Sequence, residues 1–353
     1  MEKVASRWTI TSADFLGDPV TMCFADRRSG MEFAALRHGH FGAKLHRRGP
    51  GEAWREVTAP AYPPKPEGKK DVDPNDKTRD IPWTLDTIWA LEAGRDPGEL
   101  WLGSLPGGLF HTRDHGDSWA LVEGLWNMPE RSQWMGGGAD LPGLHSIVVD
   151  PRDGDSVLIG VSSGGAWRTR DRGRTWSVAA HGMRAAFMPP ERALDPLIQD
   201  PHAIAQSPSR PERLWCQHHN GIFRSDDGGQ RWVEIEEVQP SVFGFAVAVH
   251  PTDPDTAWFV PGHSDQKRIP LDGKVVVTRT RDGGKSFQTL REGLPQEHAY
   301  DLTLRHALAV DPSGQVLAFG TTTGALFVTE DGGDHWREVT AHLPPVYVVR
   351  IDT

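Results

Sequence analysis

The chain has 353 residues, of which 38 are glycine and 28 are proline. This share of turn-forming residues argues against a helical bundle and for many short strands. The 38 Lys and Arg residues against 48 Asp and Glu residues give a formal net charge of −10, which disfavours a nucleic-acid partner, and the absence of a long apolar run disfavours a membrane partner.

The N-terminal residues, MEKVASRWTI, do not combine a basic start with an apolar run. We therefore expect no secretory signal and a cytoplasmic protein. The first strand-like segment lies at residues 6–12, and a similar one, at residues 346–351, lies near the end of the chain.

A turn-like segment recurs along the chain with the pattern Ser/Thr-x-Asp-x-Gly-x-x-aromatic. Its five clear copies end at Trp119, Trp176, Trp232, Phe287 and Trp336, which are 57, 56, 55 and 49 residues apart. A second recurring segment precedes four of these copies, in the forms HSIVVDP, HAIAQSP, FAVAVHP and HALAVDP. Each repeat predicts four short strands in about 50 residues, which is the pattern of one propeller blade.

These repeats predict an all-β fold, with residues 1–353 forming a single β-propeller domain. Blades are expected at residues 20–58, 84–123, 144–180, 201–236, 243–290 and 304–340. Residues 6–12 and 346–351 are expected to pair as a composite blade that closes the ring. We therefore interpret the propeller as seven-bladed with an incomplete last blade, and six blades are the alternative.

The aspartate of each recurring turn has a structural interpretation. Its carboxylate can accept backbone N–H bonds in a tight turn, and the glycine two residues later suits a positive φ. The closing aromatic residue is expected to pack between blades. Because active-site acids should be unique rather than repeated, we do not expect these aspartates to be catalytic.

The recurring turn resembles the Asp box, or BNR repeat, of sialidases, sortilin-type receptors, xyloglucanases and photosystem assembly factors. The whole chain also resembles bacterial WD40/YVTN/BNR-like, glycosyl-hydrolase-like propellers, through LHSIVVDP, NGIFRSDDGG and FGFAVAVHP. The resemblance implies the propeller fold and says less about function, because one fold serves many functions. A true sialidase is disfavoured, because the chain has three tyrosines and lacks the N-terminal arginine motif of that family.

Three histidines occupy one equivalent position of the repeat, at the start of the innermost strand. They are His145, His202 and His306. In a propeller these strands begin on the top face, where ligands usually bind, so the imidazoles are candidate ligands for Zn, Fe, Mn or Cu. The alternative is that each histidine only hydrogen-bonds the strand that it opens, since no HExxH or CxxC motif is present.

Long connections at 124–144, 181–201 and 291–305 should lie on the same top face, and long loops in compact domains are often functional. Their aromatic and charged residues suit a sugar or organic acid, although they could also only plug the channel. The candidate substrate-binding residues are Trp134, Arg184, Phe187, Tyr300 and, from a nearby turn, His219. The candidate catalytic residues are Glu297, His298 and Asp200. By contrast, the charged and proline-rich segment 62–80 is expected to be a solvated surface loop.

Three functions remain open from the sequence. The first is a hydrolase or lyase acting on a glycan or small molecule, with a pair of carboxylates on the top face. The second is a metal-dependent enzyme that uses the histidine cluster, and the third is a non-enzymatic scaffold that binds a protein partner.

Overall fold

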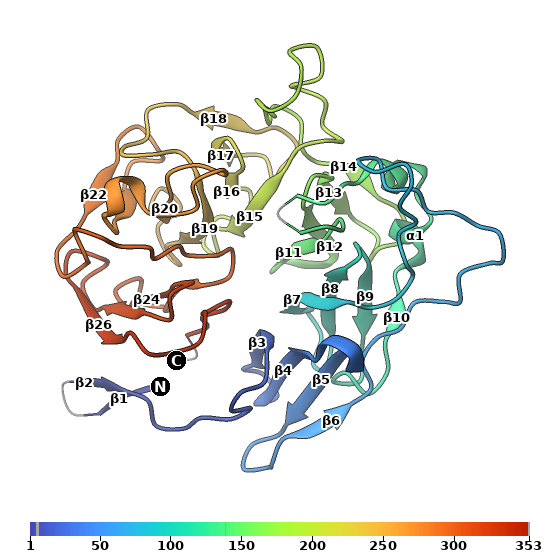
Figure 1. Ribbon diagram of the computed structural model, residues 1–353, viewed down its shortest axis with the longest axis horizontal. Helices are drawn as coiled ribbons and strands as arrows, with labels where there is room; N and C mark the ends of the chain where they lie inside the picture. Colours follow the sequence, from blue (N-terminus) through green and yellow to red (C-terminus); the bar gives the residue numbers. More distant parts are fainter. Residues whose placement is uncertain (5–6, 138, 352–353) are drawn as a thin grey trace.

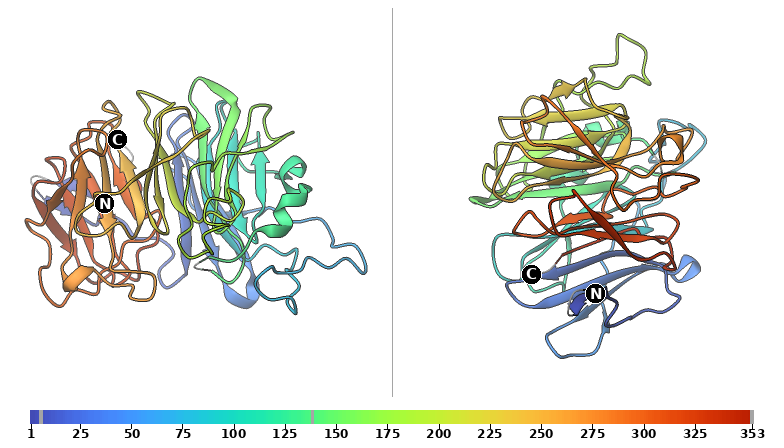
Figure 2. Two further views of the ribbon diagram at one scale, coloured as in Figure 1. Left: turned by 90° about the horizontal axis from the view of Figure 1, so that it is seen from above. Right: turned by 90° about the vertical axis from the view of Figure 1, so that its left-hand side faces the viewer.

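The computed structural model describes residues 1–4, 7–137 and 139–351 of the chain. In these residues the strands form six four-stranded antiparallel sheets and a separate two-stranded sheet. The six sheets follow one another around a ring in chain order (Figure 1). Figure 2 shows the same ring edge-on from two sides. The chain is therefore an all-β propeller.

Each blade runs from its innermost to its outermost strand in chain order. Blade 1 contains β3 (Val20–Asp26), β4 (Met31–Arg37), β5 (Ala43–Arg48) and β6 (Arg55–Val57). Blade 2 contains β7 (Thr87–Ala93), β8 (Leu100–Leu105), β9 (Leu109–Thr112) and β10 (Ala120–Leu121). Blade 3 contains β11 (Leu144–Asp150), β12 (Asp153–Val161), β13 (Gly165–Thr169) and β14 (Ser177–Val178).

The other three blades have the same order. Blade 4 contains β15 (Pro201–Gln206), β16 (Leu214–His218), β17 (Gly221–Ser225) and β18 (Val233–Ile235). Blade 5 contains β19 (Gly244–Val249), β20 (Ala257–Pro261), β21 (Val277–Thr280) and β22 (Gln288–Leu290). Blade 6 contains β23 (Leu308–Val310), β24 (Leu317–Gly320), β25 (Leu326–Thr329) and β26 (Trp336–Thr340). The connections carry one α-helical turn, α1 (Glu123–Trp126), and 3-10 turns at Gly39–Phe41, Pro129–Gln133 and Leu271–Gly273.

The hydrophobic core lies between neighbouring blades. One cluster joins Phe33 of blade 1 to Leu102 of blade 2, and further clusters join blades 2 and 3, 3 and 4, 4 and 5, and 5 and 6. The alternating residues of each strand therefore face two different neighbours, which explains why one blade cannot fold alone.

The recurring turns have the predicted geometry, as the turn after β13 shows. Thr175 donates to Asp171 from both its N–H and its hydroxyl, at 2.9 and 2.6 Å. Thr169 donates its hydroxyl to the same carboxylate at 2.8 Å, and Gly173 has a φ of 87°. In blade 4, Trp232 donates its indole N–H to Ala179 O at the end of blade 3, at 2.8 Å. In blade 4 this residue thus links the turn to the neighbouring blade.

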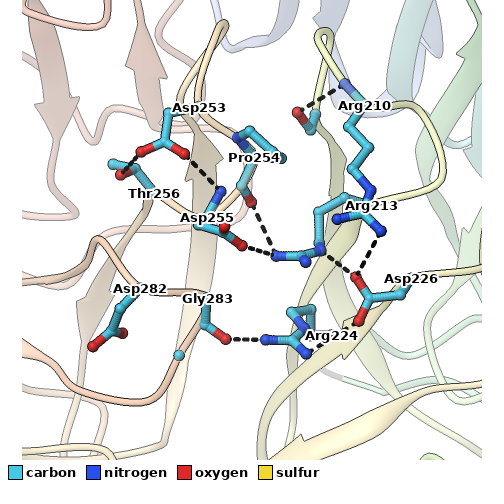
Figure 3. Close-up of polar contacts among 12 residues, drawn as sticks. Arg210, Arg213, Arg224, Asp226, Asp253, Pro254, Asp255, Thr256, Asp282 and Gly283 are labelled. Atoms are coloured by element: carbon cyan, nitrogen blue, oxygen red, sulfur yellow. Dashed lines mark hydrogen bonds and ion pairs between the residues drawn. The ribbon is translucent and has the colours of Figure 1, made fainter.

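An ionic network also links blades 4 and 5 on the face of the recurring turns (Figure 3). The buried guanidinium of Arg213 lies between the carboxylates of Asp226, from its own blade, and Asp255, from the next blade. Arg224 contacts Asp226 and donates to Gly283 O of the recurring turn of blade 5. Because one arginine is shared by two blades, this contact is expected to fix their relative position.

Among the described residues, no seventh four-stranded sheet lies between blades 6 and 1. Strands β1 (Glu2–Val4) and β2 (Arg7–Thr9) pair with each other, and residue 6 lies outside the described residues. Of residues 346–351, Val348 makes one parallel bridge, to His306. The structure therefore shows the six-bladed alternative, and a composite blade is not confirmed. Among the described residues, no helix has the length and apolar character needed to cross a membrane.

Candidate functional site

The innermost strands share a local irregularity that points side chains into the axial channel. In each of blades 1 to 5, the innermost strand has a register shift against the neighbouring strand at the equivalent place. A β-bulge of this kind re-aims the extra residue. The residues within these shifts include Thr21, Trp89, His145, His202 and Phe245. Thr21, Trp89 and Phe245 line one cavity in the channel, together with Arg305 of blade 6.

Two of the three predicted metal ligands, His306 and His145, each make one hydrogen bond through the side chain. His306 donates from Nε2 to the carbonyl of His145 at 2.7 Å, which joins blade 6 to blade 3 on the opposite side of the ring. His145 itself contacts the Ser146 hydroxyl through Nδ1 at 2.9 Å. Burial lowers the pKa of His306 to about 4, so its ring is neutral near pH 7. These two histidines match the alternative role of hydrogen-bonding the strand openings.

His202 lies apart from that pair, at the floor of a cavity of about 700 Å³ on the top face. The walls of this cavity come from the connections before blades 2, 3 and 4 and from the β20–β21 turn. The lining residues include Lys77, Gly137, Ser163, Phe187, Arg192, Asp265 and Arg268, with Asp200, His202 and His219. A volume of this size is typical of small-molecule sites.

The segment 62–80 is mostly the exposed loop that its composition predicts, but two of its carboxylates are buried and part of it lines the cavity. Asp71 and Asp73 are buried, and Arg131 pairs with Asp71 at 2.7 Å while its guanidinium lies 3.9 Å from the Trp126 ring. Neighbouring residues of the segment, Pro74, Asn75 and Lys77, line the cavity. The burial of these two carboxylates was not predicted, because composition cannot show which charges are paired in the fold.

Asp200 is the buried carboxylate of the cavity. Its Oδ1 accepts the N–H of Ser163 at 3.2 Å, while Oδ2 lies 3.4 Å from Nδ1 of His219 and 3.7 Å from Nε2 of His202. Burial alone would raise the pKa of Asp200, but the facing His202 and His219 and the nearby Arg305 outweigh burial and hold this pKa well below its usual value. Asp200 is therefore ionised at neutral pH.

The two imidazoles beside Asp200 are held by their surroundings. His202 donates from Nδ1 to Gly244 O at 2.7 Å and stacks on the Phe245 ring with centroids 4.5 Å apart. Burial lowers the pKa of His202. His219 packs edge-on against Phe187, at 5.2 Å between centroids. The side chain of His219 is 20% exposed, whereas those of Asp200 and His202 are 4% and 3% exposed.

The remaining predicted site residues lie elsewhere. Trp134 is buried against Trp167, and Arg184 pairs with Glu234 at 2.5 Å. Glu297, His298 and Tyr300 are exposed on the connection between blades 5 and 6 and do not line the cavity. The structure thus brings together Asp200, His202, His219 and Phe187, which had been assigned to three different roles.

Sequence reasoning missed the contributions of Ser163, Gly137 and Arg305. Ser163 and Gly137 act through the backbone, and an added Cβ at Gly137 would lie 3.0 Å from Oδ2 of Asp200. Arg305 lies over the rings of Trp89 and Phe245, at 4.9 and 5.4 Å, and its Nε and Nη2 have no hydrogen-bond partner among the described residues. The sequence could have indicated Arg305, because it directly precedes His306, which was already placed at the start of an innermost strand.

Comparison with known proteins gives one curated relative. The chain is 33% identical over 273 residues to the oligoxyloglucan-reducing end-specific xyloglucanase of Emericella nidulans. The match covers 72% of this chain and 29% of the relative, so the chain spans less than a third of that protein's length. No model of a known protein family matches the chain.

Solved structures show the same fold at low sequence identity. An ancestral GH74 enzyme matches with a TM-score of 0.61 and 13% identity, over 92% of this chain and 39% of that chain. The GH74 xyloglucanase from Xanthomonas campestris matches with a TM-score of 0.59 and 18% identity, over 92% and 46%. A structure of YCF48 bound to D1 peptide matches with a TM-score of 0.53 and 16% identity, over 91% and 82%. At these identities the likeness establishes the β-propeller fold alone.

Proposed function

We propose that this chain is a glycan-directed hydrolase of the Asp-box propeller class that binds its substrate in the top-face cavity and acts on it at Asp200. The observation that carries the proposal is the buried carboxylate of Asp200 in the lining of a cavity of about 700 Å³. The similarity to a curated xyloglucanase supports the substrate class. The five recurring turns support the Asp-box assignment.

The cavity offers the groups that a saccharide site uses. Phe187 is 45% exposed at its rim and can stack on a sugar ring, while Arg192 and Arg268 can bind hydroxyl or acidic groups. Ionised Asp200 suits a base or nucleophile rather than a proton donor. Asp265, which lines the same cavity and pairs with Arg268 at 2.6 Å, is the second carboxylate that we assign to the reaction.

Hydrolysis of a defined panel of oligosaccharides, including xyloglucan oligosaccharides, tests the proposal. Release of new reducing ends by the parent should fall more than about 100-fold in Asp200→Asn, because the loss of a catalytic carboxylate removes several kcal/mol of transition-state stabilisation. Asp96→Asn, a change at an exposed carboxylate between β7 and β8, should leave activity unchanged. No cleavage of any substrate by the parent, or full activity in Asp200→Asn, would contradict the proposal.

A second candidate function is binding of a peptide or protein at the top face without catalysis. Its support is the match to peptide-bound YCF48, which covers 82% of that chain, whereas the GH74 matches cover less than half of theirs. Saturable peptide binding by a parent that cleaves no saccharide would favour this function over the first.

A further inference from the structure

We infer that Asp200, His202 and His219 bind a divalent transition-metal ion at the floor of the top-face cavity. With the ion bound, Asp200 serves the proposed function as a metal ligand instead of as the base or nucleophile, and the inference rests on that function only for the role of the ion in the reaction. The binding itself follows from the geometry of three side chains. The set predicted from the sequence was His145, His202 and His306. The inferred set keeps His202 and has Asp200 and His219 in place of the other two histidines.

The separations of Asp200 from the two imidazoles are close to those in a metal site. One atom from each of Asp200, His202 and His219 lies within 4.8 Å of the other two. Oδ2 of Asp200 is 3.4 Å from Nδ1 of His219 and 3.7 Å from Nε2 of His202. Ligands bound about 2.1 Å from a tetrahedral ion stand roughly 3.4 Å apart. The same separations are too long for charge-assisted hydrogen bonds, which measure about 2.7–2.9 Å.

The neighbouring contacts decide which ring nitrogen of His202 faces Asp200. His202 must carry its proton on Nδ1, because the Gly244 carbonyl at 2.7 Å can only accept. Nε2 of His202 is therefore the ring atom that faces Oδ2 of Asp200, at 3.7 Å.

The outer contacts also resemble those that orient metal ligands. A ligand histidine typically donates its other N–H to a backbone carbonyl, as His202 does to Gly244 O. Asp200 is fixed through Oδ1 by the N–H of Ser163 at 3.2 Å, which leaves Oδ2 for the ion. Three protein ligands at the floor of a cavity leave coordination positions open to a ligand from the cavity, as in catalytic rather than structural sites.

The mixed donor set selects the class of ion. Two imidazoles and one carboxylate suit Zn²⁺, Fe²⁺ or Mn²⁺, whereas Mg²⁺ and Ca²⁺ prefer oxygen ligands. When bound, such an ion supplies a Lewis acid and an activated water beside the substrate.

Calorimetric titration of the chelator-treated, full-length protein with Zn²⁺ tests the inference. The parent should bind one Zn²⁺ per chain and gain melting temperature on binding, since a ligand of the native state stabilises it. His219→Ala should weaken binding more than about 100-fold, beyond the roughly 10–100-fold effect of residues that only orient a ligand. His219 decides the test because its side chain is 20% exposed, so the variant should fold; Asp200→Asn and His202→Ala should lose binding as well.

His335→Ala serves as the matched control. His335 contacts Asp331 at 2.7 Å in an exposed pair on the opposite face, so the variant should bind Zn²⁺ like the parent. No stoichiometric Zn²⁺ binding by the parent, or unchanged binding by His219→Ala, would overturn the inference. Zn²⁺ binding without saccharide cleavage would support the metal site and contradict the hydrolase proposal. Saccharide cleavage in the presence of chelator, by a protein that binds no Zn²⁺, would support the hydrolase proposal and contradict the metal site.

Discussion

At the scale of single residues, the recurring turns hold their aspartates as carboxylates. Hydrogen bonds from Thr175 and Thr169 lower the pKa of Asp171 to about 2. Burial would raise the pKa of Asp114, but hydrogen bonds from Ser118 and Thr112 outweigh burial and lower it to about 2. Because an unfolded aspartate has a pKa of about 3.9, each turn favours the folded state above that pH.

This coupling predicts an acid-dependent loss of stability. As pH falls from about 4 towards 2, the unfolded chain takes up protons before these folded carboxylates do, so the melting temperature should fall in that window. The double variant Asp114→Asn/Asp171→Asn should have a lower melting temperature than the parent at pH 6. Its melting temperature should fall less than that of the parent between pH 5 and pH 2.5, as followed by circular dichroism. Parallel melting-temperature profiles for variant and parent would show that these two turns do not contribute.

The residues of the candidate site were predicted one by one but not as a group. Asp200, His202 and His219 were each singled out, because the repeat places them on the top face. Their grouping could have been read from the hairpin, since Pro201 pairs with His218 and therefore brings Asp200 beside His219. The link from His306 to the carbonyl of His145 crosses the ring, and no local pattern of sequence reports such a contact.

At the scale of elements, the strands were predictable because each blade is a local unit with its own turn signals. The register shifts of the innermost strands were not predictable. A bulge hardly changes the alternation of apolar and polar residues, and it does not change the residues of the turns. These shifts place Trp89 and Phe245 in the channel, where sequence alternation alone does not assign them.

The contact between blades 4 and 5 predicts a large effect for one arginine. Arg213→Ala should lower the free energy of unfolding by about 1–3 kcal/mol, because it leaves the carboxylates of Asp226 and Asp255 without their shared partner. Arg152→Ala, which removes an arginine 54% exposed in its pairs with Asp150 and Glu212, should cost less than about 1 kcal/mol. Urea unfolding of both variants measures the difference, and equal losses would contradict the shared-arginine account of Figure 3.

At the scale of the whole molecule, ring closure depends on the C-terminal segment. Residues 346–351 contact blade 6 through the N–H of Val349, which donates to His306 O at 2.9 Å. They contact blades 1 and 2 through Val348, which packs against their shared hydrophobic cluster, and through Arg350, which pairs with Glu92 at 2.5 Å. The segment therefore joins the last blade to the first two.

Removal of residues 346–353 should open the ring. The truncated protein should melt at a lower temperature and aggregate, because it exposes strand edges and apolar surface that the segment covers. Thermal melting and light scattering of the truncated and parent proteins measure both effects. Unchanged melting and solubility would show that blades 6 and 1 close the ring without the segment.

The position of a bound metal tests the central claim most directly, since both proposals place the chemistry at the floor of the top-face cavity. Anomalous diffraction at the zinc absorption edge, from crystals grown with Zn²⁺, reveals every bound ion. We predict a peak about 2.0–2.2 Å from Nε2 of His202, Nδ1 of His219 and an oxygen of Asp200. Crystals that show no peak there, or show one only at exposed histidines such as His335, would contradict the account.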